Sequence, residues 1–328
     1  MTTSLTIALA QLNPTVGAID ANLEKARATL AGLRDVDLVL FPELYIAGYP
    51  PEDLVLRPSF VTACKDAVEK LAAEFAQGPA ILIGLPWRDG EKLHNSVALL
   101  TGGRIETVRH KYDLPNYGVF DEKRVFQPGP APGPLSVKGV RIGVPICEDI
   151  WTEETCETLA ETGAEILLSP NGSPFERNKD DVRLNLVVAR VTETNLPLAY
   201  LNQVGGQDEL VFDGASFVLN GDRSLALQMP MFEEAVAITD WRRKGDRWEM
   251  SKGDIARLPE NEEETWKACV LGLGDYVRKN RFPGVVLGLS GGIDSAVVAA
   301  MAVDALGKDH VHCVMLPYAY TSQDSLED

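Results

Sequence analysis

Short apolar segments alternate with amphipathic ones over the first 245 residues. The apolar segments are rich in Val, Ile and Leu and are bounded by Gly, Pro or Asn, which is typical of buried strands. They predict strands at residues 5–10, 37–41, 80–85, 96–100, 141–146, 166–169, 198–202, 215–219 and 235–239. Helical periodicity marks residues 22–33, 60–75 and 180–195. Strands with interspersed helices predict an α/β or α+β layered fold.

A second pattern begins near the end of the chain, after a polar, nonperiodic stretch at residues 241–264. The pattern predicts a helix over 266–279, a strand over 285–289, a helix over 294–306 and a strand over 310–316. We therefore expect one domain over residues 1–245, a linker over 246–265, and a second domain from 266 to 328.

The composition excludes several classes of protein. With 45% apolar residues, the chain has enough apolar surface to fold, and no apolar run approaches the ~20 residues that span a bilayer. The net charge of −17 disfavours nucleic-acid binding. Five cysteines without paired or zinc-site spacing, and an N-terminus without signal-peptide features, favour the reducing cytoplasm.

Three side chains have complementary chemistry: a carboxylate, an ammonium group and a thiol. Glu43 and Cys147 each follow a predicted strand, and Lys111 lies in the segment HKYDLP. A thiol needs a base or a nearby positive charge to become a good nucleophile, a glutamate can take its proton, and a lysine can stabilise an oxyanion. Spacing alone does not assemble the three, because each residue type is more often a surface or core residue.

The segments around these residues resemble the signatures of the nitrilase (carbon–nitrogen hydrolase) superfamily. The sequence FPE ends at Glu43, the HK pair ends at Lys111, and GVPICED contains Cys147, in the family's order. The resemblance implies a four-layer αββα sandwich. It also implies that Cys147 is the nucleophile, Glu43 the general base, Lys111 the holder of the oxyanion, and Glu122 a glutamate that supports the lysine and the base.

The segments 111–124 and 147–151 resemble, more narrowly, the glutaminase domain of glutamine-dependent NAD⁺ synthetases. This resemblance implies L-glutamine as substrate and no cofactor for this half. It implies glutamine-binding roles for Tyr117, Phe120, Glu148, Ser173 and Lys179. Glu148 would pair with the α-ammonium group. A basic group is needed for the α-carboxylate, and Arg177 and Arg183 compete with Lys179 for that role.

A glycine-rich turn, SGGIDS at residues 290–295, follows the predicted strand 285–289 and opens a helix. This arrangement is typical of a phosphate site, because free N–H groups and the helix dipole attract anions. It resembles the pyrophosphate loop of the N-type ATP pyrophosphatases. The resemblance implies that ATP phosphates are surrounded by Ser290, Gly291, Gly292, Asp294 and Ser295, with Asp294 helping to hold Mg²⁺.

The second domain is expected to be incomplete, since two strands do not cover a doubly wound α/β sheet of the adenine nucleotide alpha hydrolase type. Residues 315–328 extend the resemblance to the synthetase domain. Together the resemblances imply an enzyme in which the glutaminase half supplies ammonia for ATP-dependent amidation of deamido-NAD⁺.

This chain alone is expected to hydrolyse glutamine without making NAD⁺, and its second domain to be poorly supported. The alternatives are a free-standing nitrilase-family amidase acting on another small amide, and a non-catalytic assembly protein. The resemblance also implies a homo-oligomer, with no nucleic-acid or membrane partner.

Overall fold

The computed structural model describes residues 2–316. The chain divides into two compact units. The first comprises Met1–Val204 and Phe212–Leu258, and the second comprises Gly205–Val211 and Pro259–Asp328. The expected resemblance of residues 317–328 to a synthetase domain lies outside the described residues.

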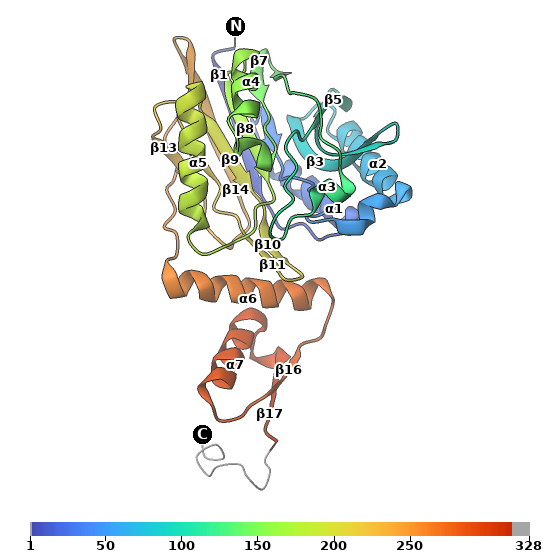
Figure 1. The fold of residues 1–328 in the computed structure, drawn as a ribbon, viewed down its shortest axis with the longest axis vertical. Coiled ribbons are helices and arrows are strands. Elements are labelled where there is room, and N and C mark those ends of the chain that lie inside the picture. Colours follow the sequence, from blue (N-terminus) through green and yellow to red (C-terminus); the bar gives the residue numbers. More distant parts are fainter. Residues whose placement is uncertain (1, 317–328) are drawn as a thin grey trace. The chain divides into compact units, whose positions relative to one another are not determined.

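A seven-stranded sheet forms one half of the first unit (Figure 1). In spatial order its strands are β15 (Arg247–Met250), β14 (Ala235–Lys244), β1 (Ser4–Gln11), β2 (Leu38–Leu40), β3 (Ala80–Asp89), β4 (Lys92–Thr101) and β5 (Arg104–His110). Strands β1, β2 and β3 are parallel to one another. The helices α1 (Ile19–Gly32) and α2 (Pro58–Glu74) bury Leu23, Leu30, Val68 and Leu71 against one face of this sheet.

A six-stranded sheet forms the other half. Its strands, in spatial order, are β13 (Leu225–Gln228), β12 (Phe217–Leu219), β9 (Leu198–Asn202), β8 (Ile166–Asn171), β7 (Val140–Gly143) and β6 (Leu135–Val137). The helices α4 (Glu154–Glu161) and α5 (Lys179–Thr194) pack on it through Cys156, Leu159, Val187 and Val191.

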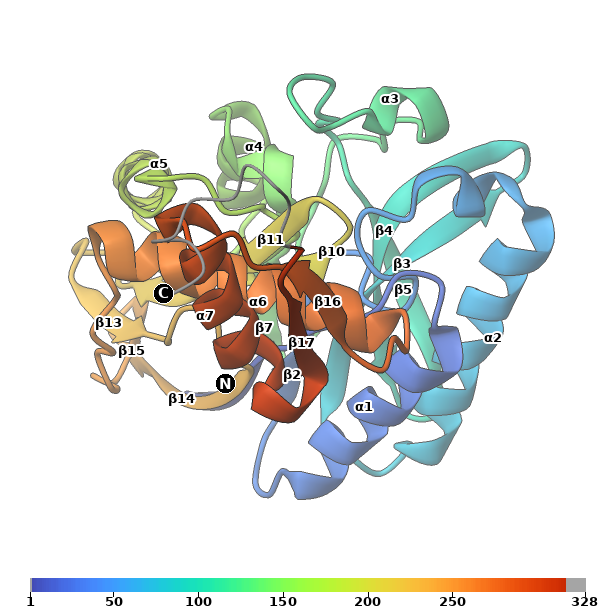
Figure 2. The ribbon, with the colours of Figure 1, turned by 90° about the horizontal axis from the view of Figure 1, so that it is seen from below.

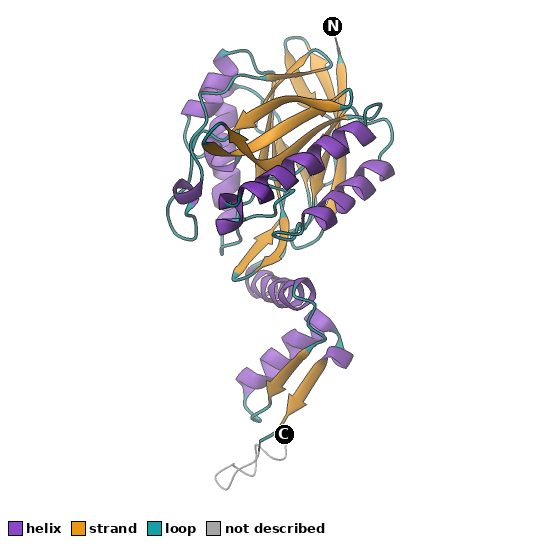
Figure 3. Ribbon diagram, turned by 90° about the vertical axis from the view of Figure 1, so that its right-hand side faces the viewer, coloured by secondary structure: helices purple, strands orange, loops and turns teal. Residues whose placement is uncertain are grey.

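The two sheets face each other across a core formed by alternate residues of their strands. In β1, for example, Ile7 and Leu9 enter this core while Ala8 and Ala10 face the α1–α2 side. Figures 2 and 3 show the strands between the two helix pairs. The expected four-layer αββα sandwich is therefore confirmed.

Shorter elements complete the first unit. They are the 3₁₀ turns η1 (Glu52–Leu56) and η2 (Cys147–Ile150), the helix α3 (Glu122–Val125), and the hairpin of β10 (Val204–Gln207) and β11 (Leu210–Asp213), whose tip groups with the second unit. No helix in the described part of the chain is long and apolar enough to cross a membrane.

The second unit contains α6 (Asn261–Lys279), β16 (Val285–Gly288), α7 (Ile293–Leu306), the 3₁₀ turn η3 (Lys308–His310) and β17 (Val311–Val314). The two strands pair in parallel. Large apolar side chains stay exposed: Val286 and Ile293 each keep 75% of their surface in solvent and Leu316 keeps 80%.

The polar stretch predicted as a linker is partly ordered structure. Residues 241–250 continue β14 into β15, and Trp241 and Trp248 are both buried whereas Arg242 and Arg247 are exposed. The connecting Gly245-Asp246 pair is a two-residue turn that suits a hairpin. The acidic run at 260–264 likewise enters α6, whose first turn favours carboxylates. The range 246–265, expected as a linker, thus contains β15 and the first turn of α6.

Two stacked histidines predict a pH dependence of stability. The rings of His94 and His110 lie 4.2 Å apart, and burial, with His94 nearby, lowers the pKa of His110 to about 4. An unfolded histidine titrates near ~6.5, so the unfolded chain binds more protons between these values. We expect the free energy of unfolding to fall as the pH drops from about 6.5 to about 4.

Urea denaturation at a series of pH values measures this loss. His110→Phe keeps a ring beside His94 but cannot titrate, so its stability should depend less on pH in this window. An identical pH dependence in the variant would assign the loss to other groups.

Candidate active site

Glu43, Lys111 and Cys147 lie just beyond the carboxyl ends of three strands from the two sheets. Glu43 follows β2, Lys111 follows β5 directly, and Cys147 follows β7. Gly172 follows β8 in the opposite sheet, and its N–H donates to Glu43 Oε2 over 2.8 Å. Layered α/β folds carry functional residues on such loops, because the rigid strands fix the starting point of each loop.

Glu43, Lys111 and Glu122 form a buried network. Lys111 Nζ lies 2.7 Å from Glu43 Oε1 and 3.0 Å from each carboxylate oxygen of Glu122. The side chains of Lys111 and Glu43 are wholly buried, and that of Glu122 is 7% exposed. Tyr49 OH donates to Glu122 Oε1 over 2.8 Å. Two carboxylates thus share one ammonium group away from water.

The electrostatics of this network keep the lysine charged. Burial alone would lower the pKa of Lys111, but Glu122 and Glu43 raise it well above its ordinary value. Burial raises the pKa of Glu122, against the opposing effect of Lys111. The thiol of Cys147 is close enough for Glu43 and Lys111 to act on it, and burial with Glu43 raises its pKa well above the ordinary value. The resting sulfur is therefore a neutral thiol.

Cys147 occupies a tight turn. Its backbone φ is 47°, in the left-handed region that costs a non-glycine residue free energy. Asp149 stabilises this turn: one carboxylate oxygen accepts from Ile146 N over 2.9 Å, and the other accepts from Tyr112 N and Asp113 N over 2.9 and 2.7 Å. Burial raises the pKa of Asp149 to about 7, although these N–H donors oppose the shift.

Three of the predicted glutamine-binding residues form a group beside the thiol. Tyr117 OH lies 3.0 Å from both carboxylate oxygens of Glu148, which adjoins Cys147 in the chain. The rings of Tyr117 and Phe120 pack edge to face with centroids 5.5 Å apart. Burial raises the pKa of Glu148, and the hydrogen bond from Tyr117 opposes that shift. Tyr117 is 51% exposed, so this group borders solvent.

Ser173 follows Gly172 and is buried. Arg183 donates through Nε to Ser173 Oγ over 3.2 Å and through Nη2 to the Ser173 carbonyl over 2.9 Å. The same guanidinium binds Asp213, so all of its nitrogens are in use. Lys179 begins α5 and pairs with Glu176. Its contacts do not join it to the other predicted residues.

The predicted ATP loop connects β16 to α7 in the second unit. Ser290 Oγ lies 3.1 Å from Ser295 Oγ and accepts from Gly292 N over 3.3 Å. Gly291 has a φ of 74°, which requires glycine in practice. Asp294 is exposed in the first turn of α7. The described residues contain no group of three or more His, Cys, Asp or Glu that could hold a metal by themselves.

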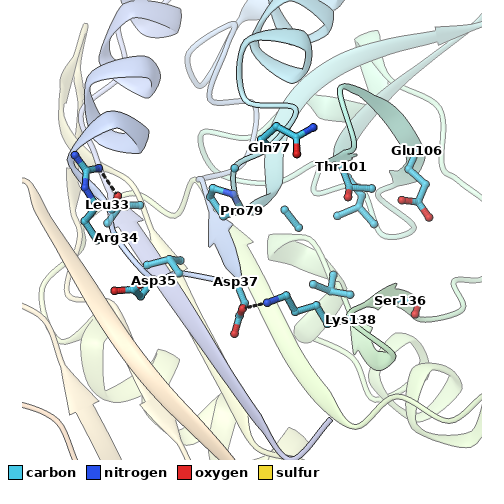
Figure 4. Close-up of a pocket in the computed structure, with 15 residues that line it drawn as sticks. Leu33, Arg34, Asp35, Asp37, Gln77, Pro79, Thr101, Glu106, Ser136 and Lys138 are labelled. Carbon is cyan, nitrogen blue, oxygen red and sulfur yellow. Dashed lines mark hydrogen bonds and ion pairs between the residues drawn. The ribbon is translucent and has the colours of Figure 1, made fainter. Parts of the chain in front are cut away.

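A separate pocket of about 560 Å³ lies at the opposite end of β2 (Figure 4). Asp37, just before β2, pairs there with Lys138. Arg34, Gln77 and Glu106 also line this pocket. None of the predicted site residues does, so the pocket is distinct from the catalytic group.

Several residues at the site carry no clear signal in the sequence. Asn95 on β4 contacts both glutamates, Tyr49 contacts Glu122, and Gly172 contacts Glu43. Their roles depend on contacts between segments far apart in the chain. The sequence could have indicated the role of Asp149, because this residue belongs to the GVPICED motif. A short acidic side chain after a strand commonly binds nearby backbone N–H groups.

Two protein-family models match separate parts of the chain. Residues 6–245 match the carbon–nitrogen hydrolase family model, and residues 265–328 match that of NAD synthase. The two matches confirm the resemblances expected from the sequence motifs.

Individual relatives resemble the chain over most of its length. The glutamine-dependent NAD(+) synthetase of Rhodobacter capsulatus is 51% identical over 330 residues, which cover 100% of this chain and 60% of that protein. The structure of glutamine-dependent NAD⁺ synthetase from Acinetobacter baumannii, in complex with ADP, has a TM-score of 0.91 and 40% identity, and the match covers 99% of this chain and 61% of that one.

A mutant of the amidase from Nesterenkonia sp. AN1 is also similar, with a TM-score of 0.65 and 26% identity, over 73% of this chain and 91% of that one. That structure shows covalent addition of the acetamide moiety of fluoroacetamide at the active-site cysteine. The present chain spans about 60% of the length of the curated synthetases that it matches.

Proposed function

The chain belongs to the carbon–nitrogen hydrolase family, and we propose that it hydrolyses the side-chain amide of L-glutamine through a thioester on Cys147. The buried Glu43–Lys111–Glu122 network beside Cys147 carries this proposal. In the reaction of a glutamine-dependent NAD⁺ synthetase, the released ammonia would amidate deamido-NAD⁺ at the expense of ATP. Support for these substrates comes from relatives named glutamine-dependent NAD(+) synthetase.

The first step joins proton transfer to nucleophilic attack. Because burial keeps Cys147 a neutral thiol, its proton passes to Glu43 as the sulfur bonds to the amide carbon. The carbonyl oxygen gains a negative charge, which the positive charge of the Lys111 ammonium group stabilises. Glu122 and Glu43 hold the other side of that ammonium group.

The second step releases ammonia. The oxyanion re-forms a carbonyl group, the C–N bond breaks, and the proton on Glu43 passes to the departing nitrogen. The product is a thioester between Cys147 and the glutamyl group. Water then attacks this thioester and gives a proton to Glu43, and the sulfur leaves to regain a proton, which frees glutamate.

The α-ammonium and α-carboxylate groups of glutamine would be recognised mainly at the solvent-exposed edge of the site. We call Tyr117, Phe120 and Glu148 at this edge the rim residues. Glu148 is suited to the α-ammonium group, and Tyr117 and Phe120 would flank it. Ser173, whose oxygen accepts from Arg183 and whose side chain also bonds Tyr200, would turn its hydroxyl group toward the α-carboxylate. Lys179 must exchange Glu176 for the substrate if it binds that carboxylate, whereas the occupied Arg183 is unsuited to the role.

The 290–295 loop is proposed to bind the phosphates of ATP. The positive end of the helix dipole at the start of α7 favours anions. A magnesium ion would fit as a shared ion, because Mg²⁺ is commonly held by one or two carboxylates together with phosphate oxygens. Asp294 supplies such an exposed carboxylate.

We also propose a reducing compartment such as the cytoplasm, since the mechanism requires a free Cys147 thiol, and a homo-oligomer. Light scattering of the purified chain checks the oligomer.

Ammonia release from glutamine tests the proposed activity directly. We expect steady release by the wild-type chain and no turnover by Cys147→Ala, because the thioester cannot form. Cys64→Ala is the matched control: Cys64 is equally buried but lies on α2 among apolar side chains, so its removal should spare turnover.

The same assay decides between substrates. Faster turnover of aliphatic amides than of glutamine would replace the glutaminase with an amidase of other specificity. Ammonia release that survives in Cys147→Ala would contradict the mechanism, and none from the wild type would favour a non-catalytic protein.

A further inference from the structure

We propose that Asn95 is a positioning residue that fixes Glu43 and Lys111 for proton transfer from Cys147. Asn95 lies on β4 and is completely buried. This inference rests on the proposed hydrolysis and adds a residue to it.

Asn95 contacts the catalytic group through both its side chain and its backbone. Its Nδ2 donates to Glu43 Oε1 over 2.7 Å and lies 3.4 Å from Glu122 Oε2. Its carbonyl oxygen accepts from Lys111 N over 2.8 Å. The register of β4 and β5 explains the second contact, because Ser96 pairs with His110 and thereby sets Asn95 opposite the next residue, Lys111.

The contacts leave Glu43 with one open position for a proton. Its Oε1 accepts from Lys111 Nζ and from Asn95 Nδ2, while Oε2 accepts only from Gly172 N. A carboxylate oxygen has two lone pairs, so Oε1 is saturated and the thiol proton must reach Oε2. Without Asn95, Oε1 regains a free lone pair and the carboxylate can rotate away from this arrangement.

A neutral amide suits the position of Asn95 beside the carboxylates of Glu43 and Glu122. Two carboxylates already share one ammonium group, so a third carboxylate would add an unpaired negative charge, whereas a neutral donor adds none. The orientation of the amide is fixed as well, since the opposite orientation would set Oδ1 against carboxylate oxygens.

The unsatisfied amide oxygen of Asn95 also indicates that this residue has a function. Asn95 Oδ1 is buried without a hydrogen-bond partner among the described residues. An unsatisfied buried oxygen destabilises a fold. A side chain selected for packing alone would avoid that cost, so the gain must come from the contacts made by Nδ2 and the backbone.

Steady-state kinetics of Asn95→Ala and Asn95→Asp test the proposal in the full chain. We expect kcat for glutamine to fall about 100-fold in both, the loss typical of a small misplacement of reacting groups, with KM changed less than about 3-fold because the rim residues stay in place. Asn95→Asp should recover part of its kcat as the pH is lowered, since a protonated carboxyl group can again donate to Glu43. Asn95→Ala should not recover in this way.

Ser96→Ala is the matched control. Ser96 is the next residue on β4, equally buried, and bonds His110 on the opposite face. Its loss removes one buried hydrogen bond without touching the catalytic group, so kcat should stay within about 2-fold of the wild type. A kcat in Asn95→Ala equal to that of Ser96→Ala would overturn the proposal. So would a loss that appears only in KM.

A second readout separates this proposal from the proposed function. Mass spectrometry can follow alkylation of Cys147 by fluoroacetamide, in which the sulfur gives up its proton and displaces fluoride, with no glutamine involved. Addition should be at least about 10-fold slower in Asn95→Ala than in Ser96→Ala. A wild type that adds the reagent but releases no ammonia from glutamine would refute the proposed substrate alone, while equal addition rates in the two variants would refute the role of Asn95.

Discussion

We expect Lys111→Met to abolish the proposed glutamine hydrolysis and to lower the free energy of unfolding by about 3–5 kcal/mol, the range measured when one partner of a buried ion pair is removed. Glu43 and Glu122 would face each other without a cation, in a place where the lysine side chain is wholly unexposed. The oxyanion would also lose its charged donor. Ammonia release and urea denaturation of the same preparation measure the two losses.

The pH dependence of this loss identifies its cause. Protonated carboxyl groups can be buried without a cation, so the stability deficit of Lys111→Met should shrink as the pH falls. The double variant Lys111→Met/Glu122→Gln restores the net charge of the network and should regain much of the stability while remaining inactive. A single variant as stable as the wild type at pH 8 would contradict the electrostatic account.

Gly84→Ala is expected to destabilise the first unit by about 3 kcal/mol, at the upper end of overpacking effects, and to reduce kcat about 100-fold. Gly84 lies on β3 against the backbone that carries Glu43, the proposed general base. A Cβ added there would be 2.7 Å from the carbonyl carbon of Glu43 and closer still to Pro42 O and Leu44 N. Backbone atoms cannot rotate aside as a side chain does, so the segment must shift. Thermal denaturation and ammonia release together measure the effect.

Gly32→Ala is the matched substitution. Gly32 ends α1, and nothing lies within 4 Å of the added methyl group. Alanine favours helix by up to about 1 kcal/mol over glycine, so this variant should be at least as stable as the wild type and fully active. If both substitutions had the same effect, steric overlap at Gly84 would not be the reason for the loss.

The sequence predicts the layers better than it predicts the edges of the sheets. Buried strands such as β8 and β9 carry continuous apolar runs, which periodicity detects. Strand β5 is missed because most of its residues are charged or polar and only partly buried. The second half of β14 and strand β15 are missed for a related reason, because their arginines hide the apolar pattern to which the buried Trp241 and Trp248 belong.

The sequence likewise predicts some residues of the candidate site and misses others. Motifs identify Glu43, Lys111 and Cys147 because each belongs to a local signature. Asn95 and Tyr49 have no such signature, since their contacts join β4 and the loop after β2 to residues 27 and 73 positions away in the chain. Three-dimensional register, which the local pattern does not encode, creates these contacts.

The pairing of β1 with β14 has a consequence for synthesis on the ribosome. Thr239 Oγ1 donates to the Ile7 carbonyl across 232 residues of chain, and the two strands pair along their whole shared length. At translation rates of about 5–20 residues per second, β1 waits roughly 12–46 s for its neighbour. One edge of β1 can meanwhile pair with β2, but the other stays open until nearly the whole sandwich has emerged. The nascent catalytic unit therefore closes late, and its first strand is the one most in need of protection from premature association.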